Sequence, residues 1–291
     1  SPGHNGISHE MIKYGLSPKF IKILKLLYES IINYDVMPKN FNIGLVKLLV
    51  KDISKDCNDF NNLRPLTISE SWAIILENIL LDELNRTFDN KSNQFGFRQK
   101  SSCSHAFFTL KELALFNKRR KKSTHLGVID ASKAFDKVNR FNLWCKLINR
   151  AEPFILRTLI NYYSVSKVVI VINLEVSNIF NITRGVKQGG PLSPFLFSVY
   201  IEELGTTLDE SEIGITIGNF TINNILYADD IILIANDEFE LNILLKITEE
   251  YGLKYEINFN QNKTNFMILF EYLRSCPSMP VIFQGLGLMG S

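Results

Sequence analysis

The sequence predicts an α+β protein organised around an antiparallel sheet. Stretches with helical periodicity and stretches rich in β-branched residues follow one another without the strict strand–helix–strand alternation of a parallel sheet. Two apolar runs that meet at a pair of adjacent acids, within 225–234, predict a hairpin. With 291 residues, 46% of them hydrophobic, the chain can bury a large core, and we expect one compact unit with sub-lobes.

Helical and extended patterns alternate in the first half of the chain. Ser17 can cap a helix whose first turn accommodates Pro18. An apolar stripe from Trp72 to Leu84 has helical spacing, whereas the continuous apolar run at 43–50 predicts a buried strand. We expect the basic run 118–122 in a loop. The predicted elements are helices at 17–32, 69–85 and 103–116 and strands at 43–50 and 126–130.

Strand patterns dominate the second half. Alternating β-rich sequence precedes a glycine-rich turn at 185–190. The predicted helices lie at 140–150, 194–208 and 237–251, and the predicted strands lie within 167–183, within 213–235, at 255–259 and at 265–270. The last twenty residues give no clear element.

Composition excludes several classes of protein. Cys57, Cys103, Cys145 and Cys276 show no C-x-x-C spacing, so we expect neither a disulfide framework nor a zinc ribbon. No apolar run is long enough to span a bilayer, and no signal peptide pattern is visible, so we expect an intracellular, soluble protein in the nucleus or cytoplasm. A net charge of +2 allows a nucleic-acid partner without indicating one.

Three acids are candidate metal ligands. Asp229 and Asp230 are adjacent at the predicted hairpin tip, where their charges repel unless a cation neutralises them. Turns also favour Asp for backbone reasons, so this pair alone is weak evidence. Asp130 ends an apolar strand, and with Asp229 it could bridge two Mg²⁺ ions about 4 Å apart, an arrangement used in phosphoryl transfer. The alternative for Asp130 is a helix N-cap.

Seven segments, in order, resemble motifs of reverse transcriptases, most closely those of non-long-terminal-repeat (LINE-type) retrotransposons. They are SPGHNGI at 1–7 (P-G-x-D-G-I, with Asn5 replacing Asp), NLRPL at 62–66, QFGFR at 94–98, VIDASKAFDKV at 128–138 (D-x-x-x-A-F-D-x-V), GVKQGGPLSP at 185–194, YADD at 227–230, and Gly252-Leu253 with Asn260 and Lys263-Thr264. Palm motifs are broadly shared, so group II intron and other retroelement enzymes stay possible relatives.

The resemblance implies a right-hand polymerase fold: a palm with an antiparallel sheet and packed helices, helical and strand fingers, and a thumb largely missing. We expect fingers with the start of the palm at 1–122, the palm at 123–270, and a tail or remnant of the palm–thumb junction at 271–291. Arg274 stands where the family has glycine. The implied partners are an RNA template, a DNA primer and dNTPs, with no membrane and with missing flanking domains of a longer polyprotein.

The resemblance also assigns roles to residues. Asp130 and Asp229 would hold two Mg²⁺ ions, for which Mn²⁺ could substitute, with Asp230 as a supporting acid, and Lys263 would lie near the leaving pyrophosphate. The implied nucleotide contacts are Lys51 (with Lys47 competing for that position), Arg64, Ala131, Phe135, Gln188 and Gly189. The implied primer and template contacts are Tyr227 and Arg98. The structural alternatives are solvated surface charge for the basic residues, a turn for Gln188, and core packing for Phe135 and Tyr227.

Three functions compete. The first is an RNA-directed DNA polymerase. The second is a catalytically inactive nucleic-acid-binding scaffold that keeps the fold. Such a scaffold has no reason to retain three candidate metal ligands. The third is an RNA-dependent RNA polymerase with the same palm, against which Phe135 and the Y-A-D-D box weigh by resemblance. The basic run 118–122 could be a phosphate contact, a nuclear targeting signal or a solvated loop.

Overall fold

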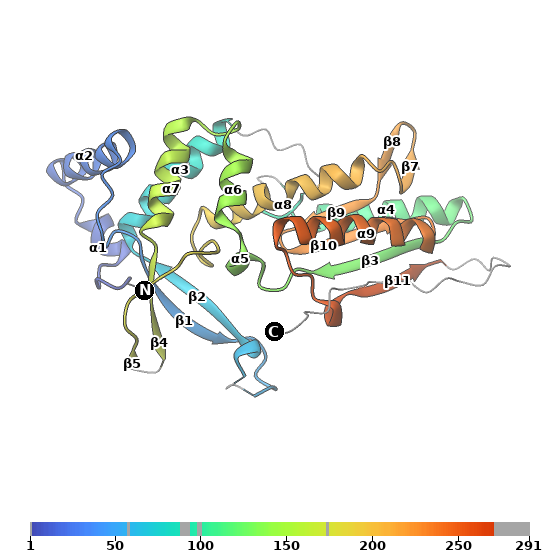
Figure 1. Cartoon of the computed structure of the whole chain (residues 1–291), viewed down its shortest axis with the longest axis horizontal. Helices are drawn as coiled ribbons and strands as arrows, with labels where there is room; N and C mark the ends of the chain where they lie inside the picture. The colour runs from blue at the N-terminus through green and yellow to red at the C-terminus, as the bar shows by residue number, and fades with distance from the viewer. Residues whose placement is uncertain (1, 57–58, 88–93, 98–100, 173–174, 271–291) are drawn as a thin grey trace. The chain divides into compact units, whose positions relative to one another are not determined.

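The computed structural model describes residues 2–56, 59–87, 94–97, 101–172 and 175–270 (Figure 1). The chain forms two compact units, each assembled from discontinuous segments: Ser1–Asp89 with Asn139–Leu196, and Asn90–Val138 with Phe197–Ser291. The mixed α+β class is confirmed. The boundaries of fingers and palm drawn at 122 and 270 stay predictions, and the tail at 271–291 lies outside the described residues.

The first unit combines helices with a mixed sheet. Its helices are α1 (His9–Tyr14), α2 (Pro18–Tyr34), α3 (Ser71–Thr87), α6 (Arg140–Leu147) and α7 (Pro153–Ser164). Its strands are β1 (Ile43–Val50), β2 (Leu63–Ser69), β4 (Lys167–Ile172), β5 (Glu175–Val176) and β6 (Phe180–Asn181). The strand order is β2-β1-β4-β5, and β6 also pairs with β4. β1 runs antiparallel to β2 and parallel to β4.

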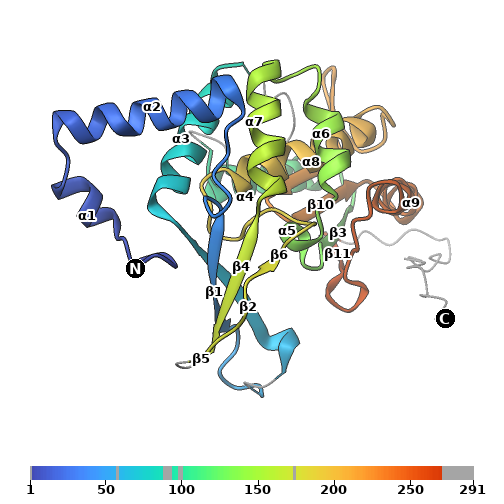
Figure 2. The ribbon, with the colours of Figure 1, turned by 60° about the vertical axis from the view of Figure 1, so that its left-hand side comes forward.

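Helix packing supplies the core of the first unit. Ser17 caps α2 as predicted, because its Oγ accepts a hydrogen bond from the Phe20 amide at 3.2 Å. Figure 2 shows α2, α3 and α7 gathered beyond one end of the long strands. Their buried side chains include Tyr28 and Ile31 of α2, Leu76 and Leu80 of α3, and Leu159 and Tyr162 of α7.

The second unit is built on a fully antiparallel sheet. Its strands are β3 (Thr124–Asp130), β9 (Asn224–Tyr227), β10 (Asp230–Ala235) and β11 (Asn265–Leu269), in the order β11-β3-β10-β9. β7 (Ile215–Ile217) and β8 (Phe220–Ile222) form a separate hairpin. The helices are α4 (Cys103–Arg119), α5 (Ala134–Lys137) and α9 (Glu238–Tyr255), with a 3₁₀ turn, η2 (Gln261–Lys263). The unit boundary falls within α8 (Ser193–Asp209).

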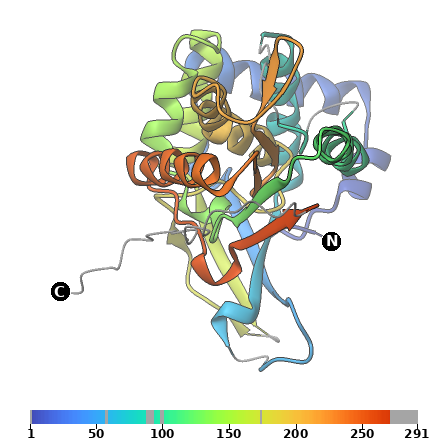
Figure 3. The same cartoon turned by 90° about the vertical axis from the view of Figure 1, so that its right-hand side faces the viewer.

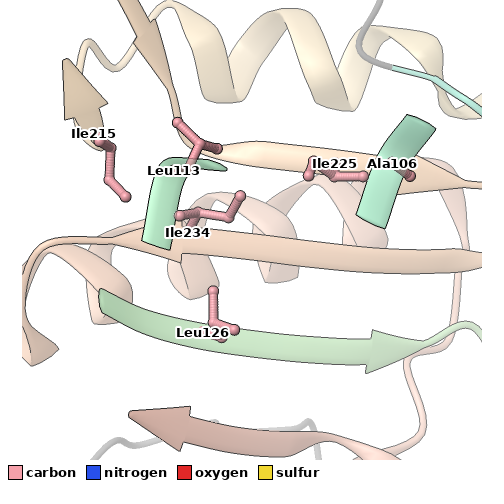
Figure 4. Close-up of a cluster of buried hydrophobic side chains, with 6 residues drawn as sticks. All are labelled: Ala106, Leu113, Leu126, Ile215, Ile225 and Ile234. Carbon is pink, nitrogen blue, oxygen red and sulfur yellow. The ribbon is translucent and has the colours of Figure 1, made fainter. Parts of the chain in front are cut away.

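Two helices cover opposite faces of this sheet, as Figure 3 shows for α4 and α9. Side chains alternate between the faces of a strand. Leu126, Ile225 and Ile234 therefore pack against Ala106 and Leu113 of α4 (Figure 4). Gly127 faces α9 instead, where a Cβ would lie 3.3 Å from Leu241 Cδ1. Strands β3, β9 and β10 are thus largely buried between the two helices, whereas β11 at the edge is mostly exposed. Among the described residues, none of the helices combines the length and apolar character needed to cross a bilayer.

Some predicted elements are wrong. The strand expected at 255–259 does not form, because α9 continues to Tyr255 and ends at Glu256 in the left-handed region (φ 57°). A single bridge joins Phe259 to Ala131 instead. The basic run does not lie wholly in a loop, since Lys118 and Arg119 form the last turn of α4, where cations favour the helix dipole. Helices α1 and α7 and strand β2 are elements that the sequence analysis did not predict.

Candidate functional site

The three candidate acids meet at one end of the sheet of the second unit. Asp130 is the last residue of β3, Asp230 is the first residue of β10, and the two are directly opposed in the antiparallel register. Tyr227 pairs with Asp230, so Ala228 and Asp229 form the two-residue loop between β9 and β10. The predicted hairpin tip is confirmed. The N-cap alternative for Asp130 is wrong, because α5 begins at Ala134 after Lys133.

A separate segment braces this hairpin loop. Ala228 has φ 58°, a left-handed conformation that costs a non-glycine residue about 1–2 kcal/mol. The Ala228 amide donates a hydrogen bond to Gln94 Oε1 at 3.1 Å, and the Gly96 amide donates to the same oxygen at 2.9 Å. The Phe95 amide donates to the Leu226 carbonyl at 2.8 Å. The sequence analysis assigned no role to Gln94.

The glycine in this bracing segment is required by space. A Cβ on Gly96 would collide with the Ala228 amide nitrogen, so the backbone of the bracing segment can approach the loop only as glycine. The backbone before Asp229 is therefore held on a second side, in addition to its own strand pairing. The Q-F-G-F-R resemblance marked the segment but not this contact.

Lys263 forms an ion pair with Asp130, the acid at the end of β3. Its Nζ lies 3.1 Å from Asp130 Oδ2 and 3.3 Å from Oδ1. The 3₁₀ turn η2 places it there, since the Asn260 amide donates to the Asp130 carbonyl at 2.8 Å. The Lys263 side chain is 62% exposed, so the pair adds about 0–1 kcal/mol to stability. Its value lies in where it places the ammonium group.

The environment of Asp230 disfavours its charged form. Partial burial raises the pKa of Asp230, and the charges of Asp229 and Asp130 raise it further, while Lys263 opposes the shift. Repulsion of this kind among carboxylates is relieved by a bound cation. Among the described residues no three His, Cys, Asp or Glu side chains already converge on one point that could hold a metal ion. Carboxylate oxygens are nonetheless the ligands that Mg²⁺ prefers, so the donor chemistry fits.

Three further candidates lie near the acids along the chain, namely Ala131, Phe135 and Tyr227. The Phe135 ring stacks on Phe197, with centroids 4.8 Å apart, and meets the Phe97 ring edge-on at 6.2 Å. Ala131 is buried, and its amide donates to the Asp229 carbonyl at 3.3 Å. Tyr227 packs against the apolar cluster under α4, which is the core role left open for it. Arg98 lies outside the described residues.

The remaining candidates belong to the first unit. Lys47, Lys51 and Arg64 are exposed and share one face of the β1–β2 pair, because Lys47 is opposed to Leu66 and Leu49 to Arg64. Lys51 Nζ donates to the Asn61 carbonyl at 2.9 Å. Both lysines fit the position, so the choice between them stays open.

Gln188 and Gly189 lie beside this basic face. The Thr67 amide of β2 donates to the Gln188 carbonyl at 2.8 Å. Gly189 has φ 115°, and a Cβ there would lie 2.6 Å from the Thr67 carbonyl oxygen. The structure therefore brings together four candidate nucleotide contacts within the first unit and the candidate acids with Lys263 within the second.

Comparisons with known proteins agree with the motifs. Residues 53–286 match a family model described as reverse transcriptase (RNA-dependent DNA polymerase). The chain is 28% identical over 261 residues to the Pol polyprotein of the type-2 retrotransposable element R2DM of Drosophila melanogaster, covering 87% of this chain and 24% of that protein. It is 22% identical over 293 residues to the RNA-directed DNA polymerase of the mobile element jockey of Drosophila funebris, covering 97% and 31%.

A solved structure shows the fold. Telomerase from Candida tropicalis, in complex with the TWJ fragment of telomeric RNA, superposes with a TM-score of 0.58 at 13% identity, over 84% of this chain and 44% of that chain. The right-hand polymerase fold predicted from the motifs is confirmed. The chain spans 24% and 31% of the length of the two retroelement relatives.

Proposed function

Because the chain belongs to the reverse transcriptase (RNA-dependent DNA polymerase) family, we propose that it extends a DNA primer on an RNA template with dNTPs, using Asp130, Asp229 and Asp230 to hold two divalent cations. The observation that carries this proposal is the register that sets Asp130 opposite Asp230 beside the Ala228–Asp229 loop. Three acids from two neighbouring strands, β3 and β10, and from the loop that precedes β10 suit two cations better than a structural role, which gains nothing from mutual repulsion.

The acids would act as ligands for Mg²⁺ or Mn²⁺. When bound, such a cation pair supplies activation of the attacking 3′-oxygen and stabilisation of the leaving oxygen. Asp130 and Asp229 would bind both cations, and Asp230 would support them. Lys263, whose ammonium already lies 3.1 Å from Asp130, would hold a proton near the pyrophosphate that departs.

Residues of the first unit would bind the incoming nucleotide. Arg64 and Lys51 carry exposed charges that suit a triphosphate, and charge-assisted hydrogen bonds to phosphate are strong. Gln188 and Gly189 would shape the nucleotide pocket, since a glycine lets the backbone approach the base pair closely. In the second unit, Ala131 and Phe135 would contact the sugar.

The relatives support a proposal about the wider setting of the chain, since it covers only part of their length. We propose that the chain works as the polymerase part of a longer retrotransposon polyprotein whose flanking regions include a thumb and an endonuclease. Its template RNA and primer would be met inside the cell, in the nucleus or the cytoplasm.

Primer extension by matched variants tests the proposal. Wild type should extend a DNA primer on an RNA template with dNTPs and Mg²⁺ or Mn²⁺, and not with NTPs. Asp229→Asn keeps the shape but removes the charge, and should lower the rate at least ~10³-fold. Asp230→Asn should be milder. Glu250→Gln, an exposed acid on α9, should behave as wild type.

Each outcome has a defined meaning. Extension by Asp229→Asn at the wild-type rate would show that the acids do not hold catalytic cations. RNA binding without extension by the folded wild type would favour the inactive scaffold instead. Extension with NTPs in preference to dNTPs would favour an RNA polymerase.

A further inference from the structure

A carboxylate of the first unit is buried on a helix whose predicted buried stripe contains only apolar residues. Glu77 lies on α3 and is 1% exposed, between the fully buried Leu76 and Leu80 turns of the same helix. A buried charge is unfavourable unless hydrogen bonds and a countercharge compensate for the lost water. Glu77 therefore requires partners, and their identity shows what it does.

Its two oxygens join α7 to the glycine-rich loop, defined as Gly185–Leu192. The Tyr162 hydroxyl of α7 donates to Glu77 Oε1 at 2.5 Å. The Leu192 amide donates to Oε2 at 3.4 Å. A Cβ on Gly190 would lie 2.6 Å from Oε2, so any larger residue there would displace the carboxylate from its present position.

The countercharge comes from the same loop. Lys187 is 5% exposed, its Nζ donates to Asn42 Oδ1, and it lies 5.4 Å from the centre of the Tyr162 ring. Asn42 in turn donates from Nδ2 to the Tyr162 carbonyl at 2.7 Å. Burial lowers the pKa of Lys187 to about 8, and the charge of Glu77 opposes this shift. The loop is thus hydrogen-bonded to Glu77 through Leu192, and the carboxylate charge also acts on Lys187 of the same loop.

The loop is held from a second direction next to Gln188. The Thr67 amide donates to the Gln188 carbonyl. Gly189 lies so close to β2 that a Cβ on it would be 2.6 Å from the Thr67 carbonyl oxygen. Residues on either side of Gln188 are therefore fixed, Lys187 and Gly190 toward Glu77 and Gly189 toward β2.

We propose that Glu77 is a positioning residue for nucleotide binding: it sets the conformation of the glycine-rich loop and so the place from which Gln188 meets the incoming dNTP. This inference rests on the proposed function, in which Gln188 contacts the nucleotide. Glu77 itself, buried on α3, touches no substrate. A displaced contact residue weakens binding of the substrate it should meet, since small misplacements cost large factors.

Three variants test this role. Glu77→Gln keeps the volume and an acceptor for Tyr162 but loses the acceptor for the Leu192 amide and the charge facing Lys187. Tyr162→Phe removes one hydrogen bond and leaves the carboxylate in place, which guards against a Glu77 variant that does not fold. Glu83→Gln makes the same chemical change on α3 at a side chain that pairs with Arg86 near the surface.

Two measurements are made on each variant. In single-nucleotide incorporation, we expect KM for dNTP to rise about tenfold in Glu77→Gln, with kcat within about twofold, and about threefold in Tyr162→Phe. In hydrogen–deuterium exchange, the loop amides should exchange about tenfold faster in Glu77→Gln. Glu83→Gln should match wild type in both.

The outcomes separate this inference from the proposed function. Unchanged KM and unchanged loop exchange in folded Glu77→Gln and Tyr162→Phe would overturn the positioning role, as would a lowered melting temperature with no change in either readout. A wild type that extends no primer would refute the proposed function. Loop exchange would still decide whether Glu77 fixes the loop.

Discussion

Replacement of Phe135 by valine tests how the second unit would distinguish dNTPs from NTPs. In the proposed function, the ring would lie beneath the incoming sugar and fill the volume that a 2′-hydroxyl needs. In the structure the ring is fixed by stacking on Phe197, with planes 25° apart, and by the edge-on Phe97 ring. Rotation of the Phe135 side chain away from this position would break both aromatic contacts and is therefore energetically unfavourable. Valine keeps an apolar side chain but removes the ring.

The magnitudes follow from these contacts. Two aromatic pairs contribute about 0.5–1.5 kcal/mol each beyond their buried area, so the loss of both pairs should lower the unfolding free energy by about 1–3 kcal/mol, in addition to the loss from the smaller buried area. This loss affects both substrates and cancels in their ratio. Removal of the clash should lower the ratio of kcat/KM for dNTP over NTP at least tenfold, which is about 1.4 kcal/mol of discrimination.

Single-nucleotide incorporation with a thermal melt separates the two effects. Phe135→Tyr keeps the ring and should keep the ratio within about threefold of wild type. Phe135→Val should lower the ratio while remaining folded at the assay temperature. An unchanged ratio in a folded Phe135→Val variant would refute the steric argument and assign Phe135 to the core alone.

Two further predictions use other contacts. Gln94→Leu leaves the Ala228 and Gly96 amides without their acceptor, which costs about 1–3 kcal/mol for each amide, so kcat for primer extension should fall at least about tenfold. Gln94→Glu keeps an acceptor, so its kcat should fall less. Equal kcat values in Gln94→Leu and wild type would show that the loop does not need this hydrogen-bond acceptor. The second concerns Lys187, whose folded pKa of about 8 lies below the ~10.4 of the unfolded chain. Between these two pKa values the unfolded chain binds more protons than the folded chain, so the unfolding free energy of wild type should rise with pH by on the order of 3 kcal/mol. Urea unfolding of Lys187→Met should show no such rise. The same rise in both proteins would show that other groups cause it.

Local pattern was sufficient where an element's neighbours do not change its preference. The hairpin at 225–234 and the strand ending at Asp130 were predicted from apolar runs and adjacent acids alone. Strand β2 was missed because Pro65 lacks an amide and usually argues against a strand. The sheet order explains its presence, since β2 lies at an edge, where a missing donor is tolerated.

Helix α7 was missed for a different reason. Its sequence, PFILRTLINYYS, is rich in aromatic and β-branched residues, which have no strong helix preference. Burial of six of its side chains, among them Leu159, Tyr162 and Tyr163, stabilises the helix instead. Tertiary packing of this kind is not visible in a local window.

The candidate acids could be found from sequence, but the groups that hold them could not. Gln94 lies 134 residues from the Ala228 amide that it accepts from, and Glu77 lies 115 residues from the Leu192 amide. Contacts between a side chain and a distant backbone amide leave no periodic signal, because the amide is present at every residue except proline. Only the glycines at 96 and 190, where the approach is closest, hinted at them.

The place of β3 within its sheet has a consequence for the whole second unit. Asp130 ends a strand that is paired along both sides, by β10 and by β11. Without β11, β3 would present a row of unpaired amides and carbonyls on an apolar strand, which is a template for pairing with another molecule. In this sheet the five-residue β11 takes the edge position, so the longer and more deeply buried strand that ends at Asp130 is not open to pairing with another molecule.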